Sequence, residues 1–136
     1  MKLTFLDAGV LIAAARGGSD QATRAMAILD DPDREFAASP FVRLEVLPQA
    51  VFNKREAEVA FYETFFQAVT TWATDLPAIA DAGYREASSY GVEAMDALHV
   101  AAAASVGAAE LITTEKPTRA IHRAQSVKVV TIYPSA

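Results

Sequence analysis

Short, largely apolar stretches alternate with longer stretches of helical composition along almost the whole chain, and this alternation constrains the fold most. The short stretches are typical of strands and cover residues 3–6, 35–38, 69–72, 110–113 and 127–132. The longer stretches predict helices over residues 10–16, 20–29, 40–52, 55–68, 75–90, 94–106 and 118–125. Strands that alternate with helices form parallel sheets with both faces covered. We therefore expect an α/β protein, a three-layer α/β/α sandwich around a central, mostly parallel sheet.

The length and composition of the chain indicate one globular domain over residues 1–136. Hydrophobic residues make up 52% of the chain and charged residues 21%, a balance unlike that of a disordered protein. Cysteine is absent, which excludes disulfides, thiolate metal sites and cysteine nucleophiles. The lack of cysteine also fits the reducing cytoplasm, where we expect the protein to act.

The charge of the chain argues against one class of function. The formal net charge is -5 and the pI is about 4.9, whereas proteins that coat nucleic acid through many phosphate contacts are usually basic. The charge does not argue against an enzyme that reaches phosphates through metal ions. No membrane span is expected, because the apolar stretch 97–112 is mostly alanine and contains His99 and Glu110.

Asp7 stands in the middle of the apolar segment LTFLDAGVLI, where a carboxylate is costly to bury. Its charge also argues that this segment is not a secretion signal. Asp7 directly follows the expected strand 3–6, and Glu115 follows the strand 110–113 in the same way. Since ligands of open parallel sheets bind at the carboxyl ends of the strands, we expect both acids at that edge. Taken singly, Asp7 could be a helix cap and Glu115 an ordinary loop residue.

Two further acids lie on apolar faces of predicted helices. Glu45 comes four residues after Phe41 in the helix 40–52 and shares its face. Asp96 lies in a helix that is apolar nearly all round, which indicates a central position. Taken alone, Glu45 could be a surface residue, and the helix dipole accounts for part of the placement of Asp96. Pro48 is expected to kink or interrupt the helix that carries Glu45.

Buried carboxylates must be paired, hydrogen-bonded or bound to a cation. Few basic residues accompany these acids: Arg43 points elsewhere on its helix, whereas His99 follows Asp96 by three residues and can bond to it. If the acids converge to within about 4–5 Å, each pair repels by roughly 3–4 kcal/mol at an effective dielectric near 20. A divalent cation would remove that cost, and ligands that are all oxygen suit Mg²⁺ or Mn²⁺.

Four segments together resemble the PIN-domain nucleases, a family that includes the VapC-type toxins of toxin–antitoxin pairs. They are LTFLDAGVLIAAARG, SPFVRLEVL, GVEAMDALHVAAAASVGAAELITTEK and VKVVTIYP, and they cover nearly the whole chain in the family's order. The resemblance implies a PIN-like fold and Mg²⁺- or Mn²⁺-dependent hydrolysis of phosphodiester bonds, usually in single-stranded RNA. The metal would polarise the scissile phosphate and activate a bound water molecule. Residue by residue, the resemblance makes the following acids the metal ligands, the last with Thr113 or Thr114 before it: Asp7, Glu45, Asp96 and Glu115.

The resemblance also implies an RNA substrate, a cognate antitoxin protein and a homodimer. Lys116 and Arg119, with His122 and Arg123, follow Glu115 and would bring positive charge to the RNA, although a solvated helix face is an equal alternative. The aromatic residues of the helix 55–68 are expected mainly in the core, with a dimer or antitoxin surface as the alternative; they are Phe61, Phe65 and Phe66.

Two positions depart from the family pattern. Members commonly carry Asn or Ser two residues after the first Asp, and this chain has Gly9, which offers only a backbone N–H. Glu115 is one methylene longer than the usual aspartate and is followed by Lys116 rather than a second acid. Our leading hypothesis is a metal-dependent ribonuclease that acts as a toxin. The alternatives are a catalytically weakened or inactive PIN-like binding module, and a receiver-like domain that lacks support because no paired Asp or glycine-rich phosphate loop is present.

Overall fold

The computed structural model describes residues 1–134 and contains a five-stranded sheet in which every pairing is parallel. The strands stand in the spatial order β3-β2-β1-β4-β5. Their bounds are β1 Lys2–Leu6, β2 Arg34–Ala38, β3 Thr71–Trp72, β4 Glu110–Thr113 and β5 Val129–Thr131. All five predicted strands are therefore present, and β1 is the middle strand.

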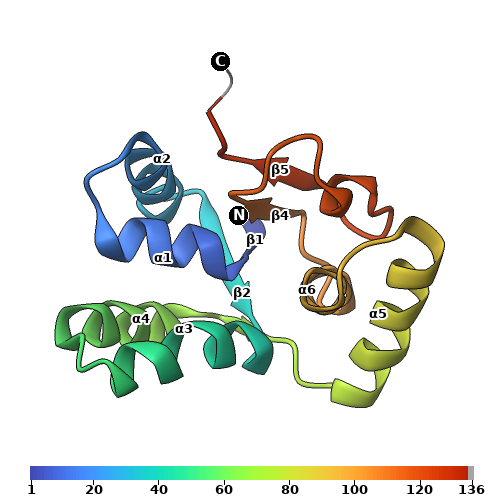
Figure 1. Ribbon diagram of the computed structural model, residues 1–136, viewed down its shortest axis with the longest axis horizontal. Coiled ribbons are helices and arrows are strands. Elements are labelled where there is room, and N and C mark those ends of the chain that lie inside the picture. Colours follow the sequence, from blue (N-terminus) through green and yellow to red (C-terminus); the bar gives the residue numbers. More distant parts are fainter. Residues whose placement is uncertain (135–136) are drawn as a thin grey trace.

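Within residues 1–134, six α-helices and one 3₁₀ helix connect the strands. They are α1 Ala8–Arg16, α2 Asp20–Leu29, α3 Pro40–Phe52, α4 Glu56–Ala68, α5 Leu76–Tyr90, α6 Ala94–Ser105 and the 3₁₀ helix η1 Ala120–Arg123. Figure 1 shows α1 to α4 on one side of the sheet and α5 and α6 on the other. The chain passes from β1 outward to β3 and then crosses back to β4, and right-handed connections in opposite directions place their helices on opposite faces. The predicted three-layer α/β/α sandwich is confirmed.

The central strands are buried on both faces, which explains why apolar residues follow one another directly within them. Phe5 and Leu6 of β1 and Leu111 and Ile112 of β4 are almost completely inaccessible to solvent. Full burial of such a side chain contributes about 1.5–3 kcal/mol. The predicted core position of the α4 aromatics is confirmed as well, since Phe65 and Phe66 are buried and Phe61 is half-buried.

Serine and aspartate side chains begin four of the helices. Asp7, Ser19, Ser39 and Asp75 each accept a hydrogen bond from a backbone N–H in the first turn that follows. Of the two effects expected of Pro48, a kink or an interruption, the interruption does not occur, because α3 continues to Phe52. Pro48 removes one backbone hydrogen bond, but the buried neighbours Leu47 and Ala50 hold the helix against the core on both sides of it.

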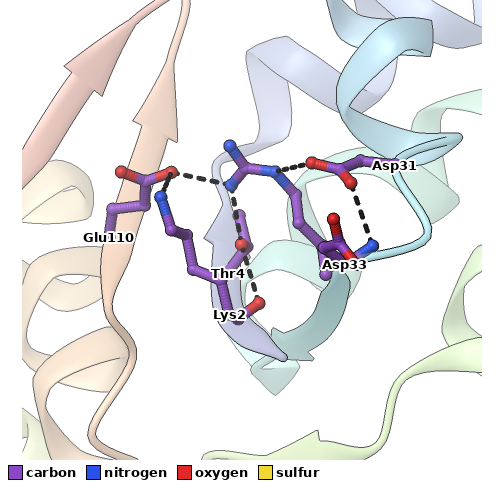
Figure 2. A network of polar contacts seen from close by, with 6 residues as sticks. Lys2, Thr4, Asp31, Asp33 and Glu110 are labelled. Carbon is purple, nitrogen blue, oxygen red and sulfur yellow. Dashed lines mark hydrogen bonds and ion pairs between the residues drawn. The ribbon is translucent and has the colours of Figure 1, made fainter.

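A buried ion network joins the amino ends of three strands (Figure 2). The Arg34 guanidinium donates to Glu110 Oε1 at 2.7 Å, to Thr4 Oγ1 at 2.9 Å and to Asp31 Oδ2 at 3.1 Å. Lys2 Nζ lies 3.7 Å from the same Glu110 oxygen. Only 6% of the Glu110 side chain is exposed, and its charge is thus balanced inside the protein.

Large apolar side chains face solvent on two helices: Leu44, Val51 and Phe52 on α3, and Leu76, Tyr84 and Tyr90 on α5. Among residues 1–134, no helix combines the length and the apolar character that crossing a membrane requires.

Candidate active site

The carboxyl ends of β1 and β4 form the point at which the strand order reverses, since the chain leaves β1 toward β2 and later returns to β4 on the other side. Open parallel sheets bind ligands in the crevice at such a point. Asp7 follows β1 directly, and Thr114 and Glu115 follow the last residue of β4, Thr113. The two strand-end acids predicted from the sequence therefore flank the reversal point.

Asp7 is both a helix cap and a buried acid. Its Oδ1 accepts a hydrogen bond from the Val10 N–H at 3.2 Å, and the residue is only 6% exposed. Burial raises the pKa of Asp7 to about 6, against the lowering effects of the Thr113 hydroxyl, the Val10 N–H and His99. The charge of Asp96 raises the pKa of Asp7 further. The cap alone does not balance this carboxylate.

Asp96 lies in the first turn of α6, within reach of the charges of the other predicted acids. Burial raises the pKa of Asp96, the charge of Glu115 raises it further, and His99 acts in the opposite direction. Glu93 and Glu45 add smaller upward contributions to the same pKa. The structure thus brings the four predicted acids into one electrostatic neighbourhood at the carboxyl edge of the sheet.

Glu45 is engaged by a histidine from another helix. His99 of α6 is 2% exposed, and its Nε2 forms a short hydrogen bond with Glu45 Oε1. His99 Nδ1 is buried and has no hydrogen-bond partner within the described part of the chain. The sequence suggested that His99 bonds to Asp96, on whose face it lies. The packing of α3 against α6 gives it Glu45 instead.

The backbone of Glu115 is held from three sides. Its N–H donates to Thr113 Oγ1 at 3.1 Å, and its carbonyl oxygen accepts from Thr131 Oγ1 at 2.6 Å. The same carbonyl lies 3.1 Å from His122 Nε2. Thr113 therefore links the loop after β4 to the site, and Thr131 and His122 are supporting residues, the first of which the sequence analysis missed.

Two cations stand at the outer rim of the acids. Arg119 Nη2 lies 3.2 Å from Glu93 Oε1, and Arg119 Nε lies 3.5 Å from Glu115 Oε2. Lys116 Nζ is positioned 5.5 Å from the centre of the Tyr133 ring. Glu93, which the sequence analysis also missed, immediately precedes α6, where an acid favoured by the helix dipole is a common signal.

The donor set has the chemistry of a site for a hard divalent cation. Carboxylate oxygens are the ligands that Mg²⁺ and Mn²⁺ prefer. The raised pKa values of Asp7 and Asp96 mean that burial and mutual repulsion disfavour their ionised forms, which a cation would favour. As the side chains stand in residues 1–134, no three Asp, Glu or His residues are grouped tightly enough to hold an ion, and Glu45 is turned to His99.

The family model of the PIN domain matches the chain over residues 4–122. The chain belongs to the PIN domain family. Its five-stranded parallel sheet and its six helices are those of a PIN-like fold, as the resemblance implied. Among curated proteins, none matches this PIN domain.

Several solved structures have a similar fold at low sequence identity. A toxin–antitoxin complex from Klebsiella pneumoniae matches with a TM-score of 0.70 and 21% identity over 96% of this chain and 98% of that one. VapBC2 from Rickettsia felis, bound to a DNA fragment from its promoter, matches with a TM-score of 0.69 and 14% identity over 95% and 98%. VapC20 from Mycobacterium tuberculosis, a sarcin–ricin loop cleaving toxin, matches with a TM-score of 0.58 and 17% identity over 79% and 86%. At these identities the likeness shows a shared fold.

Proposed function

We propose that this PIN domain is a Mg²⁺- or Mn²⁺-dependent ribonuclease and the toxin of a toxin–antitoxin pair that acts in the cytoplasm. One observation supports the proposal: acids from four separate segments influence one another's charge near the reversal point of the sheet, and two of them, Asp7 and Asp96, have raised pKa values. Among residues 1–134, Asp7 and Asp96 have no basic ion-pair partner, whereas the structural acid Glu110 is paired with Arg34. The proposed metal-binding and catalytic acids are Asp7, Glu45, Asp96 and Glu115.

The roles of the side chains follow from their positions. A bound divalent ion would polarise the scissile phosphate and lower the pKa of a water molecule at neutral pH. Asp7 and Asp96 would hold the ion most directly, since burial and like charge disfavour the ionised forms of these two acids and a cation would offset that cost. His99 orients the Glu45 carboxylate, and Arg119 orients that of Glu115.

Cleavage of RNA tests the proposal directly. The purified chain should cleave single-stranded RNA in Mg²⁺ or Mn²⁺ and stop when a chelator is added. Asp96→Asn should abolish cleavage, whereas Asp33→Asn, an exposed acid at the opposite edge of the sheet, should leave it unchanged. Equal cleavage by the parent chain and Asp96→Asn would mean that the activity belongs to a contaminant.

A PIN-like binding module without turnover is the second candidate function. It is favoured by Gly9, by the longer Glu115 and by the engagement of Glu45 with His99. Calorimetry separates the two, because the nuclease requires Mn²⁺ binding that is lost in Asp7→Asn. The absence of any Mn²⁺ binding would favour the module.

We also propose two protein partners, a cognate antitoxin and a second copy of the chain. Three similar structures are described as toxin–antitoxin or VapBC assemblies, and α3 exposes Leu44 at 64% and Phe52 at 81%. A groove of about 640 Å³ accompanies them; it is lined by Pro40, Arg43, Leu44, Leu47, Pro48, Val51, Phe52 and Glu63. Light scattering of the chain, alone and co-expressed with the neighbouring reading frame, should give the mass of a dimer and then of a larger complex. A monomer in both samples would contradict both partners.

A further inference from the structure

A hollow of about 410 Å³ lies beside the proposed active site, and we name it the rim hollow. It is lined by Gln21, Thr114, Glu115, Lys116, Arg119 and Tyr133. Glu115 belongs to both the acid cluster and the rim hollow, so the two are continuous. The lining comes from three separate parts of the chain: the start of α2, the loop after β4 and the segment after β5.

The charge of the rim hollow differs from that of the rest of the protein. The chain has a net charge of -5, yet two cations and one acid line this hollow. Arg119 is held in place by Glu93 and Glu115, and Lys116 is held over the ring of Tyr133. Basic side chains fixed next to an acidic metal site suit an anionic ligand such as a phosphate group.

Tyr133 is tied to the active-site loop through one residue. Its N–H donates to Thr131 Oγ1 at 2.9 Å, and the same hydroxyl donates to the Glu115 carbonyl at 2.6 Å. The neighbouring carbonyl of Ile132 accepts from Arg24 Nη1 at 3.2 Å. These bonds anchor the backbone of Tyr133 beside the loop that carries Glu115, and an aromatic ring at such a position is suited to stack on a nucleobase.

Gly9 leaves room for the side chain of Thr114, which lines the rim hollow next to the acid cluster. A Cβ atom on Gly9 would lie 2.4 Å from Thr114 Oγ1 and 3.4 Å from Asp7 Oδ1. The first distance is shorter than real Cβ contacts, so a side chain at this position would push Thr114 away. Gly9 is helical and its φ is not positive, so space rather than backbone conformation explains the glycine.

We propose that the rim hollow binds the nucleotide adjacent to the scissile phosphate of a single-stranded RNA. Lys116, Arg119 and the Thr114 hydroxyl contact its phosphate, the Tyr133 ring stacks on its base, and the Gln21 amide contacts the base edge. This inference rests on the proposed nuclease function, because RNA is the ligand that function supplies. The ligand class is a nucleotide unit of RNA.

RNA binding without cleavage tests the inference. In the Asp96→Asn background, fluorescence anisotropy measures the affinity of a short, labelled single-stranded RNA of mixed sequence. Tyr133→Ala should weaken binding by about tenfold, since base–aromatic stacking has that magnitude. Tyr133→Phe keeps the ring and should keep most of the affinity. Tyr84→Ala is the matched control, because Tyr84 is exposed on α5 away from the rim hollow.

The basic residues have a separate readout. Lys116→Gln should weaken binding and reduce the slope of log affinity against log salt by about 0.7, the value for one phosphate contact in a single strand. Equal affinities for Tyr133→Ala and Tyr84→Ala, or no RNA binding at all, would overturn the subsite. If the Tyr133 and Lys116 effects appear but the parent chain never cleaves RNA, the subsite stands and the nuclease function fails.

Discussion

The amino edge and the carboxyl edge of the sheet, where the strands begin and end, both contain buried acids, but the neighbours of these acids differ. At the amino edge, Glu110 is paired with Arg34 and lies near Lys2 (Figure 2). At the carboxyl edge, Asp7 and Asp96 face other carboxylates, and their pKa values are raised. Burial is similar at Glu110 and Asp7, so the difference lies in the neighbours rather than in exposure.

The comparison separates an edge whose acids contribute to stability from an edge whose acids fit the proposed active site. A buried carboxylate with a guanidinium partner forms part of the fold, and its loss affects folding. Carboxylates that repel one another cost stability, and proteins tolerate such a cost at functional sites. The positive ends of two helix dipoles offset part of this cost, because Asp7 caps α1 and Asp96 lies in the first turn of α6.

Breaking the amino-edge network should have the largest effect. Arg34→Met leaves Glu110 buried without its partner and should lower the free energy of unfolding by about 3–5 kcal/mol, measured by urea denaturation. Arg34→Met combined with Glu110→Leu should recover most of this loss. The exposed Arg85→Met is the control, and equal losses in Arg34→Met and Arg85→Met would show that the network contributes nothing.

Removing one carboxyl-edge charge should affect activity rather than folding. Asp96→Asn should reduce RNA cleavage by at least about 100-fold, since metal-based charge stabilisation is worth several kcal/mol. The free energy of unfolding should stay equal or rise, because a repelling charge is gone. A fall in stability as large as that of Arg34→Met would contradict the proposed contrast between the edges.

Asp7→Asn should stabilise the protein at neutral pH. The folded pKa of about 6 exceeds the ordinary 3.8, so the folded state binds more protons between these values. The stability of the parent chain should therefore fall as the pH rises from about 4 to about 6, by up to about 3 kcal/mol. Asn retains the helix cap and removes this dependence. The urea midpoints of both chains at pH 5 and pH 7.5 measure this pH dependence. Parallel pH profiles of the two chains would refute the prediction.

Divalent ions should stabilise only the carboxyl edge. At pH 7.5, Mn²⁺ at about 100 times its dissociation constant should add about 2.7 kcal/mol to the parent chain, seen as a higher Tm. The gain should shrink near pH 5, where Asp7 binds a proton, and vanish in Asp96→Asn. Arg34→Met should keep the full gain, and its loss there would mean that the two edges are coupled.

The smallest effect concerns the contact between Gly9 and Thr114. Replacing a helical glycine by alanine usually gains about 1 kcal/mol. Here Gly9→Ala should lose stability, since the new Cβ would lie 2.4 Å from Thr114 Oγ1. In a Thr114→Ala background the same change should show the usual gain. Equal effects of Gly9→Ala in both backgrounds would disprove this contact.

Local sequence signals predicted the layers of the fold well, and they placed Asp7 and Glu115 after strands, where the structure has them. The alternation of strands and helices depends on neighbours along the chain, so spacing alone revealed it. Asp7 was predictable because a carboxylate within an apolar strand end is costly without a partner. The extent of η1 was harder to predict from the sequence, because its 3₁₀ turn depends on the packing of the chain against β5.

The sequence by itself determined that this protein is an α/β sandwich with acids at the carboxyl edge of its sheet. Only the tertiary structure decided which residues meet: Glu45 with His99, Glu110 with Arg34, and Thr114 with Gly9. The members of these pairs are 54, 76 and more than a hundred positions apart in the sequence, respectively. Their contacts therefore depend on how distant helices and strands pack. Periodicity reports which face of an element a residue occupies, whereas the partner on that face is set by the packing of distant segments.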